Sequence, residues 1–202
     1  LNTKEHNKVI QFVVNEVSGK IPVIAGTGAN STTEAIELTQ HAMKAGSDAC
    51  LLVTPYYNKP TQEGLFQHYK KIANDVSIPI LLYNVPGRTS CDMQPETVQR
   101  LSNIGNIIGI KEAVDSKERI KKLIDLCGED FLIISGDDPT AMHTILSGGK
   151  GVITVTGNIM PMEMHMMCKA ALEGDKERAK EFNDKMSAFY ELLFIESNPI
   201  PV

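Results

Sequence analysis

The chain has 202 residues, of which 42% are hydrophobic and 22% charged, and these ordinary globular proportions exclude the disordered and fibrous classes. Twenty basic and 25 acidic side chains give a formal net charge of −5, which argues against partners such as nucleic acid or an anionic membrane. The apolar runs reach only about six residues, far short of the roughly 20 that span a bilayer, so no membrane span is expected.

Two periodicities alternate along the chain. Short, nearly continuous apolar runs are typical of parallel strands buried on both faces, and segments with helical spacing separate them. In chain order the sequence predicts helix 4–17, strand 21–25, helix 32–45, strand 50–54, helix 62–75, strand 80–85, helix 95–102, strand 107–113, helix 116–127, strand 131–135, helix 139–147, strand 151–156, and helices 161–172 and 175–195.

Local signals mark several helix ends. Asp138 followed by Pro139 is typical of an N-cap with a proline at the first helical position. Gly46 and Gly128 are candidate helix ends, since glycine adopts the left-handed conformation that closes many helices.

Six strand–helix repeats without a low-complexity linker predict a parallel α/β architecture. Two forms are open, a doubly wound sheet or a closed (β/α)8 barrel. Six strands are too few to close such a barrel, and the chain begins on a helix. We therefore expect that N-terminal strands of the domain are missing from this sequence.

The sequence offers only weak signals for a cofactor or a metal. GTGANS at 26–31 has a serine where a dinucleotide fingerprint needs its third glycine, so a tight turn before a helix is favoured. Asp137 and Asp138 have no third carboxylate at ligand spacing. The methionine-rich start of the helix around His165 is more typical of a packing surface than of a ligand site.

The cysteines and histidines also give no signal for a metal site. Neither residue type shows zinc spacing, and the four cysteines lie far apart without a CxxC pair. Reduced, mostly structural thiols in a cytoplasmic protein are therefore expected.

Lys111 is the residue that does not fit its surroundings. It ends the apolar run 107–110, at the carboxyl end of a predicted parallel strand, where α/β proteins place their active sites. Desolvation there would favour the neutral amine, a nucleophile that condenses with a carbonyl to form a Schiff base. The alternative is a strand-end lysine whose ammonium extends to solvent.

The preceding strand adds two groups at the same end of the sheet. Tyr83 ends the run 80–83 and could relay protons, although a core tyrosine is the simpler alternative. Arg88 follows in a tight loop and could hold a substrate carboxylate in bidentate fashion, although it could also be a surface arginine. Three coincidences at one end of one sheet favour an active site.

The motifs at these positions resemble the dihydrodipicolinate synthase family. YNVPGRT at 83–89 and GIKEA at 109–113 carry the resemblance. Further matches are VIAGTGAN at 23–30, VTPYYNKPTQEGL at 53–65, SGDD at 135–138, GGKGVITVTGN at 148–158 and NPIPV at 198–202.

The resemblance implies a (β/α)8-barrel lyase of the class I aldolase type, which condenses pyruvate with L-aspartate 4-semialdehyde in lysine and diaminopimelate biosynthesis. It implies no metal and no organic cofactor beyond a pyruvate imine, and a homodimer or homotetramer. Residues 1–158 would form a partial barrel, and 159–202 the last barrel helix region and the start of a C-terminal helical segment. The first two strands and the rest of that segment would be absent.

The resemblance also implies residue roles. Lys111 matches the Schiff-base lysine, Tyr83 the proton-relay tyrosine and Arg88 the arginine that holds the semialdehyde carboxylate. The remaining matches are Tyr57, which would cross a subunit interface, and Gly136 and Ile153, which would lie near the bound pyruvate and the lysine. The segment that supplies the relay threonine would lie upstream of Leu1, so the activity of these residues alone is in doubt.

A lysine effector site in relatives matches four positions: Asn30, Glu34, Tyr56 and His6. Thr3 stands where lysine-sensitive relatives often carry a histidine, so weak or absent inhibition by lysine is expected. Three alternatives to the synthase are an N-acetylneuraminate lyase or keto-sugar-acid aldolase, a truncated form that binds without turnover, and an NAD-binding oxidoreductase, which the missing third glycine disfavours.

Overall fold

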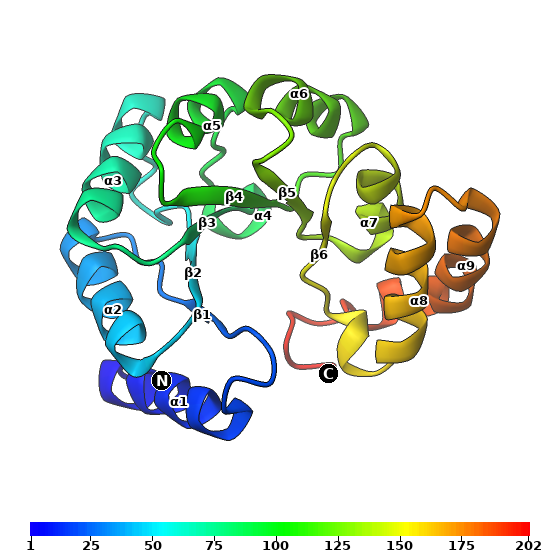
Figure 1. The fold of residues 1–202 in the computed structure, drawn as a ribbon, viewed down its shortest axis with the longest axis horizontal. Coiled ribbons are helices and arrows are strands. Elements are labelled where there is room, and N and C mark those ends of the chain that lie inside the picture. Colours follow the sequence, from blue (N-terminus) through cyan, green and yellow to red (C-terminus); the bar gives the residue numbers. More distant parts are fainter. The chain divides into compact units, whose positions relative to one another are not determined.

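The computed structural model describes residues 1–202, which divide into two compact units, Leu1–Ile110 and Lys111–Val202. Strands and helices alternate in both units, from blue to green in the first and from green to red in the second (Figure 1). The predicted α/β architecture is therefore confirmed.

The first unit is a parallel sheet covered by helices. Its strands follow the chain order, with β1 parallel to β2 and β2 parallel to β3. Figure 1 shows α1, α2, α3 and α5 outside these strands. Its elements are α1 (Thr3–Val17), β1 (Ile24–Gly26), α2 (Thr32–Ala45), β2 (Ala49–Val53), α3 (Gln62–Asp75), β3 (Ile80–Asn84), α4 (Pro86–Thr89), α5 (Pro95–Ser102) and the first four residues of β4 (Ile107–Glu112).

Helix ends in the first unit follow from their capping residues. The Asn2 side chain and the Glu5 side chain cap each other's backbone amides at the start of α1. Ser31 accepts a hydrogen bond from the amide of Glu34 at the start of α2, as the turn reading of 26–31 expects. Gly46 ends α2 with a φ of 93°, a left-handed conformation that costs glycine little.

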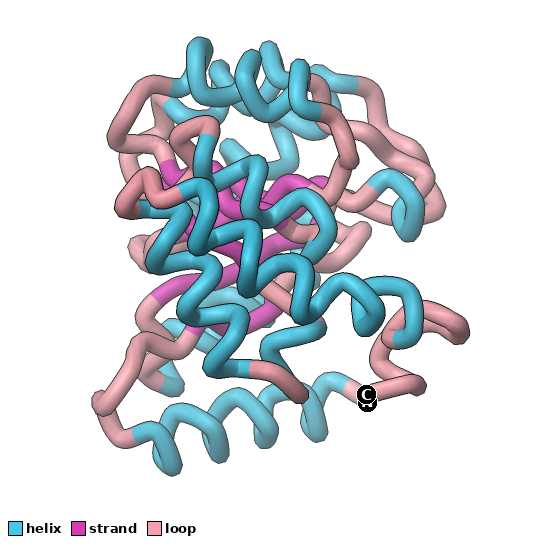
Figure 2. Tube along the Cα trace, turned by 90° about the vertical axis from the view of Figure 1, so that its right-hand side faces the viewer, coloured by secondary structure: helices cyan, strands magenta, loops and turns pink.

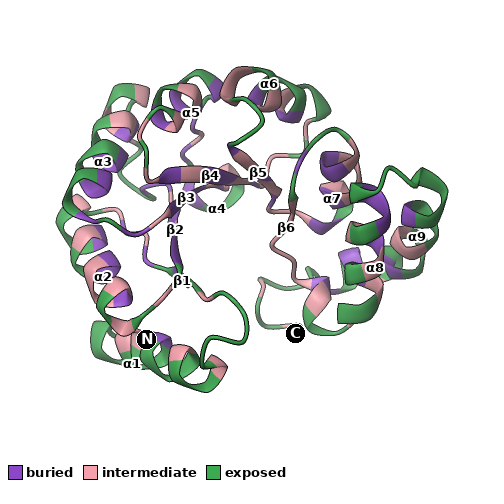
Figure 3. Cartoon of the chain, viewed as in Figure 1, coloured by how far each residue is buried: buried purple, intermediate pink, exposed green.

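Burial follows the predicted pattern in β2 and β3. Leu52, Ile80 and Leu82 are fully buried, and α2 and α3 alternate buried and exposed positions, whereas α1 is mostly exposed (Figure 3). Such strands bury apolar side chains on both faces, which explains their nearly continuous hydrophobicity.

The second unit contains a shorter parallel sheet, and β5 is parallel to β6. After β6 the chain forms helices and loops only. Figure 2 distinguishes the helices (cyan), strands (magenta) and loops (pink). The elements are the end of β4, α6 (Lys117–Cys127), β5 (Leu132–Ser135), α7 (Asp138–Leu146), β6 (Gly151–Val152), η1 (Thr156–Asn158), α8 (Pro161–Leu172) and α9 (Lys176–Leu192).

The methionine-rich helix supplies core residues. Met164 and Met167 of α8 are buried with Met186 and Tyr190 of α9 and with Ala141 of α7. The interpretation of this run as a packing surface is therefore confirmed.

Three predicted boundaries are wrong, besides the end of helix 175–195, which lies at Leu192. Strand 21–25 begins only at Ile24, and strand 151–156 is reduced to Gly151–Val152. The Asp138 carboxylate accepts hydrogen bonds from the amides of Val155 and Thr156, which turns the chain out of the sheet.

The capping pattern of α7 is the third correction. Asp137 is the N-cap, and its carboxylate accepts from the amide of Thr140. Asp138 is thus the first helical residue and Pro139 the second. The short helix α4 (Pro86–Thr89) is an element that the sequence pattern missed.

None of the helices combines the length and the apolar character that crossing a membrane requires.

Candidate active site

In the first unit, Tyr83 occupies the last but one position of β3 and is half-buried. Burial raises the pKa of its hydroxyl above the ordinary value, and the positive charge of Arg88 opposes this shift in part. At neutral pH the phenol therefore keeps its proton and can donate it to an oxygen atom of a bound molecule.

Arg88 is exposed on α4, and buried hydroxyl groups hold the turn that carries it. The Thr54 hydroxyl donates to the Thr89 hydroxyl over 3.2 Å, and the Cys91 amide donates to the same Thr89 oxygen over 3.2 Å. Thr54 and Thr89 are 0% and 3% exposed. The guanidinium is thus presented from a fixed turn.

Asn84, the last residue of β3, is fully buried and fixes the following loop. Its amide nitrogen donates to the Asp92 carboxylate over 2.9 Å, and its amide oxygen accepts from the Met93 amide over 2.9 Å. Sequence reasoning missed Asn84, Thr54 and Thr89, although each is a polar residue at the end of an apolar strand or in the motif around Arg88.

Tyr57 lies in the loop between β2 and α3. Its φ of 75° is rare for a residue with a side chain, and it is 89% exposed. Its ring therefore extends into solvent, away from the packed side chains of its own unit.

In the second unit, Lys111 lies in β4 and is half-buried. Its side chain passes directly over Gly136, because a Cβ atom at that glycine would lie 3.0 Å from both Cγ and Cε of Lys111. Only glycine leaves room for the lysine at this position. The structure thus brings two of the predicted site residues together.

Ile153 follows β6, and its amide donates to the Ser135 carbonyl over 3.0 Å. The Asp138 carboxylate, 3% exposed, holds the amides of Val155 and Thr156 two and three residues further on. The backbone around Ile153 is therefore fixed on both sides.

Glu112 and Arg119 form a buried ion pair that sequence reasoning missed. The carboxylate and Nε lie 2.8 Å apart, and the two side chains are 0% and 10% exposed. The signal was present in the sequence, because a second charged residue follows Lys111 in an otherwise apolar strand.

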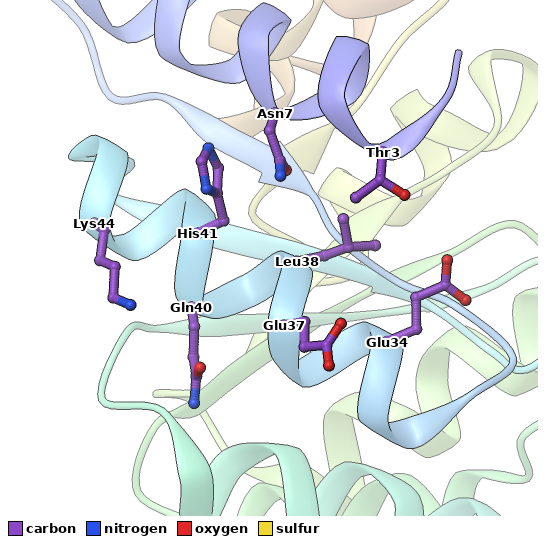
Figure 4. Close-up of a pocket in the computed structure, with 8 residues that line it drawn as sticks. All are labelled: Thr3, Asn7, Glu34, Glu37, Leu38, Gln40, His41 and Lys44. Carbon is purple, nitrogen blue, oxygen red and sulfur yellow. The ribbon is translucent and has the colours of Figure 1, made fainter.

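The four predicted effector residues lie in α1 (His6), before and in α2 (Asn30 and Glu34), and after β2 (Tyr56). Asn30 donates to the Tyr56 carbonyl over 3.2 Å, and His6 donates to the Gly26 carbonyl over 2.8 Å. Glu34 instead lines a pocket of about 520 Å³ between α1 and α2 (Figure 4). That pocket is lined by Thr3, Asn7, Glu34, Glu37, Leu38, Gln40, His41 and Lys44.

No group of three or more histidine, cysteine, aspartate or glutamate side chains is arranged to hold a metal ion. All four cysteines are free thiols, and burial raises the pKa of Cys50 and of Cys168 to about 11. Both thiols are therefore protonated at neutral pH and unsuited to nucleophilic attack.

Comparison with known proteins identifies the group of enzymes to which this arrangement belongs. The family described as the dihydrodipicolinate synthetase family matches residues 1–202. The chain belongs to this family. The prediction from the motifs around Tyr83 and Lys111 is thereby confirmed.

Relatives in the dihydrodipicolinate synthetase family are close. The 4-hydroxy-tetrahydrodipicolinate synthase of Pseudomonas putida (strain W619) is 61% identical over 202 residues, which are 100% of this chain and 69% of the relative. The chloride-inhibited dihydrodipicolinate synthase of Acinetobacter baumannii, crystallised with pyruvate, is 52% identical with a TM-score of 0.98, covering 100% of this chain and 69% of that one. A dihydrodipicolinate synthase variant characterised as monomeric is 41% identical with a TM-score of 0.96, covering 100% of this chain and 68% of its own.

Proposed function

We propose that this protein is a 4-hydroxy-tetrahydrodipicolinate synthase, a lyase that condenses pyruvate with L-aspartate 4-semialdehyde in lysine and diaminopimelate biosynthesis. The observation that carries the proposal is the Lys111 side chain, half-buried at the end of β4 and running over a glycine that leaves it room. Family membership and relatives of up to 61% identity bearing this enzyme name support it.

Lys111 is the nucleophile in this proposal. Its neutral amine adds to the keto carbon of pyruvate, and loss of water leaves an imine that joins the two. The imine withdraws electrons from the pyruvate methyl group, which loses a proton and attacks the aldehyde carbon of the semialdehyde. No metal and no organic cofactor takes part.

In the first unit, Tyr83 transfers protons and Arg88 binds the second substrate. Tyr83, whose hydroxyl stays protonated at neutral pH, relays the protons that turn the carbinolamine oxygen into water. Arg88 holds the semialdehyde carboxylate through paired N–H donors. Gly136 and the carbonyl of Ile153 lie beside pyruvate and the lysine amine.

Tyr57 completes the proton relay of a neighbouring subunit in a homodimer or homotetramer. Its high exposure and fixed, unusual backbone support this role, because a tyrosine aimed at its own unit would be buried. Because one solved relative is a monomeric variant, the oligomeric state of this protein has to be measured in solution.

The finer assignment of the fold is also a proposal. The strands β1 to β6 belong to an eight-stranded (β/α)8 barrel, in which residues 1–158 form barrel and 159–202 lead into a C-terminal helical segment. The high TM-scores, which extend over the whole of this chain, support this assignment.

The experiment is a substrate test on the purified protein. Consumption of pyruvate should depend on added L-aspartate 4-semialdehyde and yield the condensed product. Cleavage of N-acetylneuraminate or condensation of pyruvate with a neutral sugar aldehyde instead would assign the protein to an aldolase of different specificity. Absence of both reactions would contradict the proposal.

A further inference from the structure

We propose that the buried Glu112–Arg119 pair positions Lys111 for imine formation. This inference rests on the proposed function, because it assigns a role in the chemistry of the lysine. Glu112 is the next residue after Lys111 in β4, and successive side chains of a strand point to opposite faces. The carboxylate therefore acts from the face opposite to the amine.

Glu112 makes three contacts that fix the end of the strand. Its carboxylate accepts from Nε of Arg119 over 2.8 Å and from the amide of Val114 over 3.0 Å. Its backbone carbonyl accepts from the amide of Gly136 over 2.7 Å. One residue thus ties β4 to the following loop, to α6 and to the end of β5.

One of these contacts bears directly on the lysine. The amide of Gly136 donates to the Glu112 carbonyl, and the Lys111 side chain occupies the space that a Cβ atom at the same glycine would need. A shift of the β4 end relative to Gly136 would therefore displace the lysine side chain. Misplacement by about 1 Å can reduce a rate on the order of 100-fold.

The buried ion pair contributes little net stability to the fold. Both side chains are at most 10% exposed, and desolvation of two charges offsets much of their attraction. Well-packed apolar residues often give equal or higher stability at such sites. A defined geometry beside the nucleophile is the property that two methionines would not reproduce.

The test combines a variant that breaks the pair with one that replaces it. Glu112→Gln leaves the Arg119 guanidinium without its carboxylate and is expected to destabilise the protein. The double variant Glu112→Met with Arg119→Met removes both charges and is expected to fold stably. In the intact protein this double variant should lose about 10-fold to 100-fold in kcat, with KM for pyruvate changed by less than about 3-fold.

Two further variants complete the design. Arg119→Lys keeps the charge but not the guanidinium fork, so it should retain more kcat than Arg119→Met. The matched control is the exposed pair Glu63–Arg100, 57% and 46% exposed, whose replacement by two methionines should leave kcat unchanged.

The outcomes separate the two proposals. A double methionine variant that folds and has wild-type kcat would overturn the positioning role, while the wild-type enzyme would still support the proposed function. A wild-type protein that neither condenses pyruvate nor forms a borohydride-trapped adduct would contradict the proposed function and the positioning role together.

Discussion

The two units hold their site residues by different physical means. In the first unit the Thr54 hydroxyl is hydrogen-bonded to Thr89 in the turn that carries Arg88, and Asn84 at the end of β3 is hydrogen-bonded to the Asp92 carboxylate. In the second unit the group next to the nucleophile is a buried ion pair, Glu112 and Arg119. We infer that the buried ion pair restrains the strand end that carries the proposed nucleophile, whereas hydrogen bonds restrain the turn that carries the proposed substrate-binding arginine.

The largest effect is expected from Lys111→Arg. Arginine keeps the positive charge, but it does not deprotonate near neutral pH and forms no imine, so activity should fall by at least about 10³-fold. Steady-state condensation assays measure the loss. Lys150→Arg, on the exposed turn before β6, is the control and should retain full activity.

A buried histidine of the first unit predicts a specific loss of stability in acid. His68 is 7% exposed, hydrogen-bonded to Thr32, and burial lowers its pKa to about 4. The unfolded chain binds the proton near pH 6.5 and the folded one only near pH 4. Stability is therefore lost as pH falls between these values, on the order of 3 kcal/mol in total.

Urea unfolding at pH 7 and pH 4.5 measures the stability that protonation of His68 removes. His68→Gln should lose less stability on acidification than the wild-type protein. The control is His165→Gln, at an exposed position of α8. This variant should lose as much unfolding free energy between pH 7 and pH 4.5 as the wild type. An equal loss of unfolding free energy on acidification in the wild type and in His68→Gln would show that the fold does not hold His68 neutral.

Arg88→Ala tests whether the first unit holds a substrate. A charge-assisted carboxylate contact is worth roughly 1.5–3 kcal/mol, which is about 10-fold to 100-fold in affinity. The KM for the semialdehyde should rise by that factor and the KM for pyruvate much less. An equal rise for both substrates would make Arg88 a structural residue.

The hydroxyl of Thr89 offers a milder test of the same turn. Thr89→Val keeps the shape but leaves the Thr54 hydroxyl and the Cys91 amide without their partner, at a cost of about 1–3 kcal/mol in unfolding free energy. Thr89→Ser keeps the hydroxyl and should stay near wild type. Equal stability of the two variants in urea would contradict the importance of this hydrogen bond.

The smallest effect is expected from adding the free amino acid lysine as an inhibitor. Of the four predicted effector residues only Glu34 lines the pocket between α1 and α2, which Thr3 also lines. The family resemblance implies a histidine at the position of Thr3 in lysine-sensitive relatives. Calorimetric titration should show no micromolar binding. Micromolar binding, with inhibition, would overturn the prediction of weak sensitivity.

The sequence predicted the strand–helix order because both periodicities are strong in this chain. The family resemblance implied that Gly136 lies near Lys111, and the structure places the Lys111 side chain over that glycine. The sequence prediction failed where one side chain decides the backbone, as when the Asp138 carboxylate ends β6 after Gly151–Val152. Such long-range capping leaves no periodic signal.

The supporting residues were missed for a related reason. Glu112 and Arg119 are seven positions apart, on a strand and on the following helix, and although a charge in an apolar strand marks Glu112, nothing in the sequence marks Arg119 as its partner. Only the fold shows that they are buried together. The eight-stranded barrel, the cytoplasmic location, the subunit assembly and the roles of all the predicted site residues stay predictions.

The most direct measurement is the position of the covalent adduct. The wild-type protein is incubated with pyruvate, reduced with borohydride, digested and analysed by peptide mass spectrometry. The account predicts one added pyruvate-derived group, located on Lys111 and absent without pyruvate. An adduct on another lysine, or no adduct in a protein that condenses the two substrates, would contradict it.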